Sequence, residues 1–215
     1  ERASRWIRRG AALGADLLVL PEMFATGFSM TVPRASAPRE RRIEALGALA
    51  KELEVTILFG AAAALAKDPE GRGVNQAIAL GPKGQHLATY EKIHPFSFAQ
   101  EDKHYRGGAS LASFKVKGAR VVPYICYDLR FPEVFRKGAD SADVMVVIAN
   151  WPEARRHAWK SLLVARAIEN QCYVLGVNRV GEGKGLTYRG DSLFVDPLGE
   201  VRASLSIQEG LVGGE

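Results

Sequence analysis

The sequence predicts a layered α/β domain, in which helices cover the faces of β-sheets. Amphipathic helical segments alternate along the chain with short, continuous apolar runs, which is the pattern of strands buried beneath helices. At least three pairs of strand-like runs are also separated by short turn sequences, as in β-hairpins. Because hairpins join antiparallel strands, these pairs favour a mixed arrangement over a purely parallel, doubly wound sheet.

Buried strands are predicted where continuous apolar runs end at turn-forming or charged residues. These runs are residues 17–21 (LLVLP), 55–61 (VTILFGA), 143–150 (DVMVVIAN) and 172–178 (CYVLGVN). The three predicted hairpins are residues 74–92 around GPKG, residues 111–126 around a Lys-Gly turn, and residues 186–205 around DPLGE.

Helices are predicted in four segments of the chain, which are residues 3–14, 40–54, 131–139 and 153–171. In the second segment one helical face collects the apolar side chains, which are Ile43, Leu46, Leu49, Ala50 and Leu53. Pro132 falls in the first turn of the third segment, where its missing N–H group costs nothing.

Length and composition indicate one globular domain over residues 1–215, large enough to bury a core without disulfides or metals. The chain has only two cysteines, Cys126 and Cys172, which form neither a disulfide framework nor a zinc pattern. Single thiols of this kind are typical of the reducing cytoplasm, which is the predicted location.

Charge and motifs exclude several classes of partner. The net charge is +5, and the basic clusters are interpreted as solvated helix faces because no nucleic-acid motif accompanies them. Attraction of an acidic small substrate stays open. No signal peptide is predicted, because residues 1–15 carry several Arg but no apolar h-region. No membrane span is predicted either, because the apolar runs are far shorter than the ~20 residues that a span needs. Metal, nucleotide and dinucleotide motifs are also missing, so no metal or cofactor is expected.

Three polar residues follow predicted strands and are candidates for a site. Glu22 lies at the carboxyl end of a predicted strand, where α/β sheets place their sites. This position fits a general base and an exposed loop residue equally well. Lys92 lies among aromatic residues, where a lysine can stabilise an oxyanion, although most lysines are surface residues. Cys126 lies at a strand-to-helix junction that favours a thiolate, yet a buried structural thiol is the equal alternative.

Three segments, in this order, resemble the nitrilase superfamily of carbon–nitrogen hydrolases: LVLPEMF, YEKIHPF and ICYDLRFPEVFR. Residues 150–181 and 188–201 also resemble segments of this family, so the resemblance covers nearly the whole chain. It implies a four-layer α-β-β-α sandwich. Members usually begin with an earlier strand and end with a longer tail, so the domain is expected to be truncated at both ends, either as a fragment or naturally.

The resemblance also implies a role for each candidate residue. Glu22 matches the general base, Lys92 the oxyanion stabiliser and Cys126 the nucleophile. Glu101 is the candidate for a further glutamate that positions the substrate, and the main-chain N–H of Tyr127 is the candidate for a second oxyanion donor. Cys172 is expected to pack in the core.

Within the superfamily, PEMFATGFSM, KIHPFSF and CYDLRFPEVFR most resemble the ω-amidases. These enzymes hydrolyse the terminal amide of 2-oxo acid amides such as 2-oxoglutaramate and release ammonia, without a cofactor. True nitrilases carry Trp-Glu after the cysteine, whereas this chain has Tyr127 and Asp128. N-carbamoyl amino acid hydrolases, which share a similar cysteine segment, and other aliphatic amidases are the alternatives.

The substrate side of the site is less defined by the sequence. Arg130 and Arg179 are candidates for binding the carboxylate of an oxo acid amide, and an ion pair of Arg130 with Asp128 or Glu133 is the structural alternative. The aromatic candidates for lining the pocket, each of which suits the core equally well, are Phe28, Tyr127, Phe131 and Trp151.

Two hypotheses of other classes are a non-catalytic scaffold and a thiol redox sensor. An intact set of four candidate residues disfavours the scaffold. A sensor requires a resolving cysteine, and Cys172 lies 46 residues after Cys126. By analogy with the family, a homodimer or higher homo-oligomer is expected.

Overall fold

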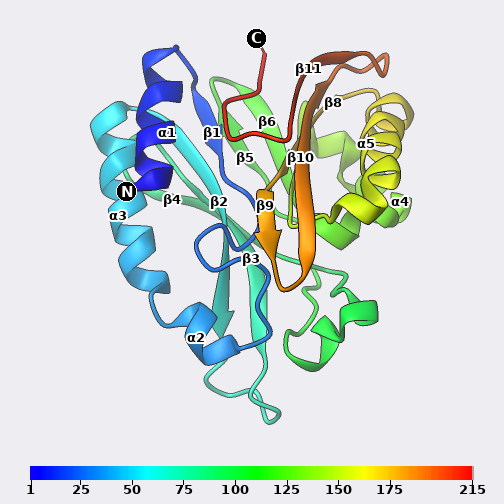
Figure 1. Ribbon diagram of the computed structural model, residues 1–215. Helices are drawn as coiled ribbons and strands as arrows, with labels where there is room; N and C mark the ends of the chain where they lie inside the picture. The colour runs from blue at the N-terminus through cyan, green and yellow to red at the C-terminus, as the bar shows by residue number, and fades with distance from the viewer. Residues whose placement is uncertain (215) are drawn as a thin grey trace.

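Two β-sheets pack face to face between two layers of helices in the computed structural model, which describes residues 1–214 (Figure 1). The predicted four-layer α-β-β-α sandwich is therefore confirmed. Its helices are α1 (Arg2–Ala12), α2 (Val32–Ser36), α3 (Arg39–Leu53), α4 (Pro132–Gly138) and α5 (Arg156–Asn170).

The first sheet contains four strands in the order β1, β2, β3, β4. Their bounds are Leu17–Val19, Thr56–Ala64, Gly73–Leu80 and His86–Glu91. Strands β1 and β2 are parallel, whereas β2, β3 and β4 form an antiparallel meander. This sheet is therefore mixed, as the hairpin pattern predicted.

The second sheet has the strand order β11, β10, β8, β7, β6, β5, and β9 pairs with β10 outside this path. In chain order, β5 to β11 are Phe114–Val116, Ala119–Ile125, Val144–Ala149, Tyr173–Asn178, Val180–Gly183, Leu186–Val195 and Val201–Ser206. Strands β6, β7 and β8 are parallel neighbours, so their carboxyl ends meet at one edge of the sheet.

Apolar side chains fill all three spaces between the layers. The two sheets share a core that includes Leu58, Tyr90, Ile125, Val146 and Ile148. Helices α1 and α3 cover the outer face of the first sheet through Ile7, Leu46 and Leu49, which pack on Ile57 and Phe59. Helices α4 and α5 cover the second sheet through Phe135, Trp159 and Leu163, which pack on Tyr124 and Val147. Figure 1 shows these two helical layers on opposite sides of the molecule.

The structure adds elements that the sequence pattern did not predict. Helix α2 is a five-residue segment, too short to show a helical period, and β9 has the sequence VGEG, which does not alternate between apolar and polar residues. Short 3₁₀ helices also occur, including η2 (Glu101–Lys103) and η3 (Cys126–Arg130). A third, η5 (Glu153–Arg155), replaces the start of the α-helix predicted over residues 153–171. Among the helices of residues 1–214, none is long and apolar enough to cross a membrane.

Close packing of α5 on the second sheet depends on Gly176 in β8. A Cβ atom at this position would lie 2.3 Å from Cδ1 of Leu163 and 2.9 Å from Cζ2 of Trp159. We expect Gly176→Ala to lower the free energy of unfolding by about 1–3 kcal/mol, because it overpacks a filled core. Urea denaturation measures this loss. Gly213→Ala is the control, since a Cβ there meets nothing within 4 Å; equal stability of the two variants would contradict this packing argument.

Candidate active site

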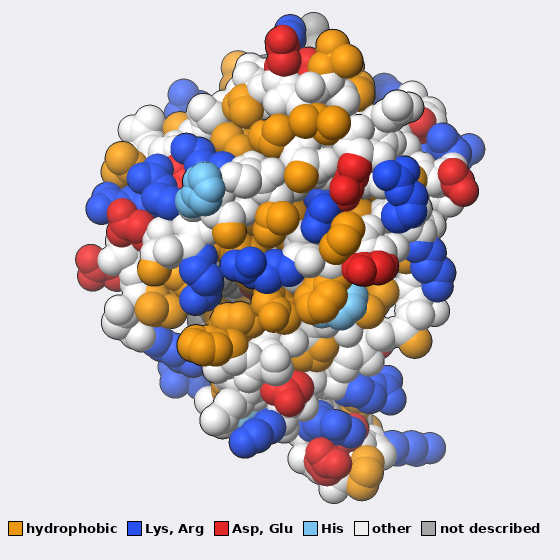
Figure 2. Space-filling model, turned by 90° about the vertical axis from the view of Figure 1, so that its right-hand side faces the viewer, with side chains coloured by type: hydrophobic (Ala, Val, Ile, Leu, Met, Phe, Trp, Pro, Cys, Tyr) orange, Lys and Arg blue, Asp and Glu red, His pale blue; other side chains and the backbone are white. Residues whose placement is uncertain are grey.

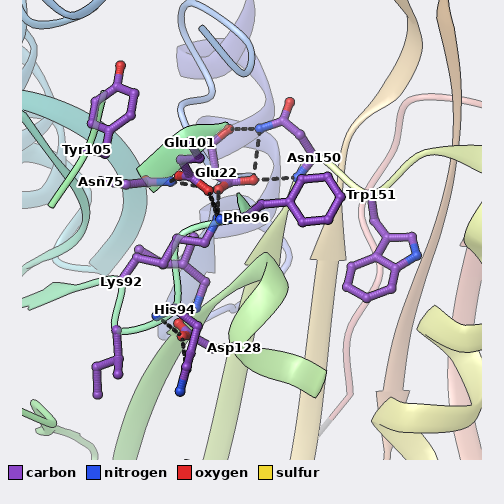
Figure 3. A network of polar contacts seen from close by, with 12 residues as sticks. Glu22, Asn75, Lys92, His94, Phe96, Glu101, Tyr105, Asp128, Asn150 and Trp151 are labelled. Atoms are coloured by element: carbon purple, nitrogen blue, oxygen red, sulfur yellow. Dashed lines mark hydrogen bonds and ion pairs between the residues drawn. The ribbon is translucent and has the colours of Figure 1, made fainter. Parts of the chain in front are cut away.

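The strand ends bring the candidate residues together between the two sheets. Glu22 follows β1 at a distance of three residues, whereas Lys92, Cys126 and Asn150 directly follow β4, β6 and β7. Glu101 comes from the 3₁₀ turn η2, which lies on the loop after β4. Figure 3 shows Glu22, Lys92 and Glu101 converging from these separate segments.

Lys92 forms a buried ion pair with each of two glutamates. Its Nζ atom donates to Oε2 of Glu101 at 2.8 Å and to Oε1 of Glu22 at 3.1 Å. All three side chains are at most 1% exposed. Burial disfavours the charged ammonium, but the carboxylates of Glu101 and Glu22 outweigh this effect and raise the pKa of Lys92.

Two asparagines complete the hydrogen bonds of this cluster. Asn75 donates its side-chain amide to Oε1 of Glu22 at 2.7 Å and to Oε1 of Glu101 at 3.0 Å. Asn150 donates its main-chain N–H to Oε2 of Glu22 at 2.8 Å. Neither asparagine was a site candidate from the sequence, although the position of Asn150 at the end of an apolar strand resembles that of Glu22.

The backbone between Glu22 and β2 is unusually close. A Cβ atom on Gly60 would lie 2.5 Å from Cα of Glu22 and 2.4 Å from the main-chain nitrogen of Met23. Only glycine fits this contact without displacing the Glu22 main chain. Gly60 therefore helps to fix the position of the Glu22 carboxylate.

Cys126 adopts a left-handed backbone conformation with φ of 47°. A residue other than glycine in this region costs roughly 1–3 kcal/mol, and such residues cluster at functional sites. The turn occurs where β6 ends and η3 begins. Burial, together with the Glu22 carboxylate, raises the pKa of the Cys126 thiol well above its ordinary value.

This direction differs from the thiolate predicted at a strand-to-helix junction. The 3₁₀ turn η3 separates Cys126 from α4, which begins at Pro132, so the thiol does not lie at the helix terminus. Burial and the nearby carboxylate instead favour the neutral thiol. A general base is therefore needed to generate the thiolate at neutral pH.

Asp128 ties the Cys126 turn to the Lys92 segment. Its buried carboxylate accepts hydrogen bonds from the Tyr90 hydroxyl at 2.8 Å, the Ile125 main-chain N–H at 3.0 Å and the His94 main-chain N–H at 2.9 Å. The His94 ring, whose Nδ1 lies 2.9 Å from Asp128, stacks on Phe131. Asp128 therefore has a structural role, and it is not paired with Arg130.

A cavity of about 80 Å³ opens beside this cluster. Its lining residues include the candidate nucleophile and base, aromatic side chains and two arginines: Glu22, Phe28, Phe96, Ala99, Cys126, Tyr127, Arg130, Asn150, Trp151, Pro152, Arg155, Leu186 and Tyr188. Of the four aromatic candidates, Phe131 is not among these lining residues. Arg179 is also not among them, and its guanidinium packs over Tyr188 and donates to the Glu182 carbonyl oxygen.

This sandwich, with a cavity at the strand ends, has the architecture of a nitrilase-type hydrolase. A family model described as "Carbon-nitrogen hydrolase" matches residues 1–212. The chain belongs to this carbon–nitrogen hydrolase family.

Two curated relatives are similar over most of the chain. The Omega-amidase YafV of Escherichia coli (strain K12) is 40% identical over 192 residues, which cover 89% of this chain and 73% of that protein. The 2-oxoglutaramate amidase of Bacillus subtilis (strain 168) is 36% identical over 204 residues, which cover 94% of this chain and 78% of that protein.

Two solved structures share the fold. XC1258 from Xanthomonas campestris, a CN-hydrolase superfamily protein with an arsenic adduct in its active site, has a TM-score of 0.85 and 33% identity, covering 99% of this chain and 82% of its own. A mutant amidase from Nesterenkonia sp. AN1 carries the acetamide moiety of fluoroacetamide on its active-site cysteine. It has a TM-score of 0.85 and 25% identity, covering 98% of this chain and 79% of its own.

We expect Asp128→Asn to lower the free energy of unfolding by about 1–3 kcal/mol, because a buried donor loses its acceptor. Each oxygen of the carboxylate accepts from a main-chain N–H, at Ile125 or at His94. The asparagine NH₂ group must then face one of these donors. Urea denaturation measures the loss, with Asp140→Asn at an exposed position as the control. Unchanged stability of Asp128→Asn would show that these hydrogen bonds contribute little.

Proposed function

We propose that this protein hydrolyses the terminal amide of small 2-oxo acid amides, such as 2-oxoglutaramate and 2-oxosuccinamate, to the dicarboxylate and ammonia. The buried Glu22–Lys92–Glu101 cluster beside the Cys126 cavity carries this proposal. The relatives named omega-amidase and 2-oxoglutaramate amidase support the choice of substrate.

In the proposed first half-reaction, Cys126 is the nucleophile and Glu22 the general base. Glu22 accepts the thiol proton while Sγ forms a bond to the amide carbon. The raised pKa of Cys126 suits this order, because a neutral thiol needs a general base to remove its proton. When the tetrahedral intermediate collapses, the C–N bond breaks, Glu22 gives the proton to the departing nitrogen, and ammonia leaves a thioester on Cys126.

In the second half-reaction, water is the nucleophile. Glu22 takes a proton from the water as its oxygen attacks the thioester carbon. The C–S bond then breaks, the proton returns to the Cys126 sulfur, and the acid is released. Every proton that is removed in one step is therefore returned in a later one, and no other reactant is needed.

Lys92 and Tyr127 are the proposed donors to the oxyanion. An ammonium group has three N–H donors, of which Lys92 uses two for Glu22 and Glu101, so that one is left for the substrate oxygen. Tyr127 lies in the first turn of η3, where main-chain N–H groups lack a partner within the helix. Glu101, which holds Lys92 and the Phe96 N–H, positions the ammonium.

Removal of the nucleophile is expected to abolish turnover. Cys126→Ala should lower the rate of ammonia release on the order of 10⁴-fold or more, because both half-reactions use its sulfur. Cys172→Ala is the matched control, since this second thiol is buried in the core formed by α5 and the second sheet. Near-normal turnover by Cys126→Ala, in a coupled ammonia assay, would refute the assignment.

A substrate screen tests the proposed reaction itself. We expect the fastest ammonia release from 2-oxoglutaramate and 2-oxosuccinamate, in comparison with an N-carbamoyl amino acid and a nitrile. Preference for the N-carbamoyl amino acid would favour the alternative hydrolase. Activity on the nitrile alone would contradict the amidase proposal.

We further propose that residues 1–215 form one catalytic domain, that it functions in the cytoplasm and that it is a homodimer. The core shared by both sheets supports a single domain. Two free cysteines suit a reducing compartment. The homodimer rests on analogy with the family, and light scattering after gel filtration tests it.

A further inference from the structure

Two arginines line the Cys126 cavity without an acidic partner. Within residues 1–214, neither the Arg130 nor the Arg155 guanidinium forms a salt bridge or hydrogen bond with another residue. The neighbouring Arg156 differs, since it pairs with Asp191 at 2.7 Å. Because a guanidinium presents five N–H donors, two unpaired ones facing a cavity can bind an anion there.

Aromatic rings hold both guanidinium groups in place. Cζ of Arg130 lies 5.2 Å from the ring centroid of Trp151, and Cζ of Arg155 lies 5.1 Å from that of Phe96. The main chain of Arg155 is also anchored, because its carbonyl oxygen accepts a hydrogen bond from Nε1 of Trp151 at 2.8 Å. Stacking of this kind leaves the N–H donors free and reduces the entropy lost on binding an anion.

The two arginines change the net charge of the groups at the cavity. The cluster of Glu22, Glu101 and Lys92 carries two negative charges and one positive charge, so by itself it repels an anionic substrate. Among the described residues that line the cavity, Arg130 and Arg155 are the cationic ones. Their two positive charges outweigh the net negative charge of the cluster and make the total charge positive. Figure 2 shows Lys and Arg side chains beside hydrophobic ones around a hollow in the surface.

We propose that Arg155, together with Arg130, binds the carboxylate at the end of the substrate remote from the amide, and thereby selects anionic amides over neutral ones. The bidentate geometry of an arginine and a carboxylate suits this role. The proposal takes its substrate class from the proposed function, but the anion subsite itself is testable without turnover.

Alkylation of Cys126 provides that test, because iodoacetate and iodoacetamide have nearly the same size and differ in charge. The rate of each reaction is measured by mass spectrometry of the Cys126 peptide. We expect Arg155→Leu to lower the ratio of the iodoacetate rate to the iodoacetamide rate about tenfold, as for loss of a charged hydrogen bond. Arg155→Lys, which keeps the charge, should recover part of the ratio.

Lys184→Leu is the matched control for loss of one positive charge. Lys184 is exposed and lies two residues before Leu186, which lines the cavity. The control should keep the wild-type ratio. An unchanged ratio in Arg155→Leu, or an equal fall in Lys184→Leu, would overturn the subsite. Arg130→Leu provides a second variant if Arg155→Leu does not fold.

The subsite and the proposed function can fail separately. If the alkylation ratio falls in Arg155→Leu but 2-oxoglutaramate is not hydrolysed, the anion subsite holds and the proposed function is wrong. If 2-oxoglutaramate is hydrolysed but the ratio does not change, the proposed function holds and the subsite is wrong.

Discussion

The Lys92 ammonium lies between the carboxylates of Glu22 and Glu101, and the rest of the site depends on this buried arrangement. Three ionised groups out of contact with water are costly unless each is paired and hydrogen-bonded. Here the two asparagines, Asn75 and Asn150, supply the remaining donors to the carboxylates. Loss of Lys92 would leave two buried carboxylates without a counter-charge, and loss of either glutamate would remove one of the two acceptors that hold the ammonium. These residues therefore act as a unit rather than as separate contributors.

Around this cluster, local backbone constraints fix the groups that are proposed to react. The left-handed turn at Cys126 follows β6 directly, and Asp128 joins that turn to the segment carrying Lys92. The close approach of Gly60 also fixes the main chain of Glu22. Glu22, Lys92 and Cys126 are thus held by three different strands, so their relative positions follow from the packing of the two sheets.

The sequence predicted those parts of the site that follow directly from strand ends. Glu22, Lys92 and Cys126 each come after an apolar run, and such ends converge in a layered fold. Glu101 was identified by family resemblance alone, because its loop has no periodic pattern. Asn75 and Asn150 were missed because their importance depends on which carboxylate is buried beside them. The direction of the Cys126 pKa shift was also not predictable, since burial and Glu22 act through tertiary contacts rather than local sequence.

The contact between Glu22 and Asn150 has a consequence for folding. These residues are 128 positions apart in the chain, and the Asn150 N–H holds the Glu22 carboxylate. Closing so long a loop is entropically costly, and contacts of this range are typical of slow-folding topologies. During synthesis, the first sheet leaves the ribosome well before Asn150 exists. The nascent chain therefore carries a carboxylate that lacks its final partner, and the hydrogen-bonded cluster around Glu22 can be completed only after β7 has joined the second sheet.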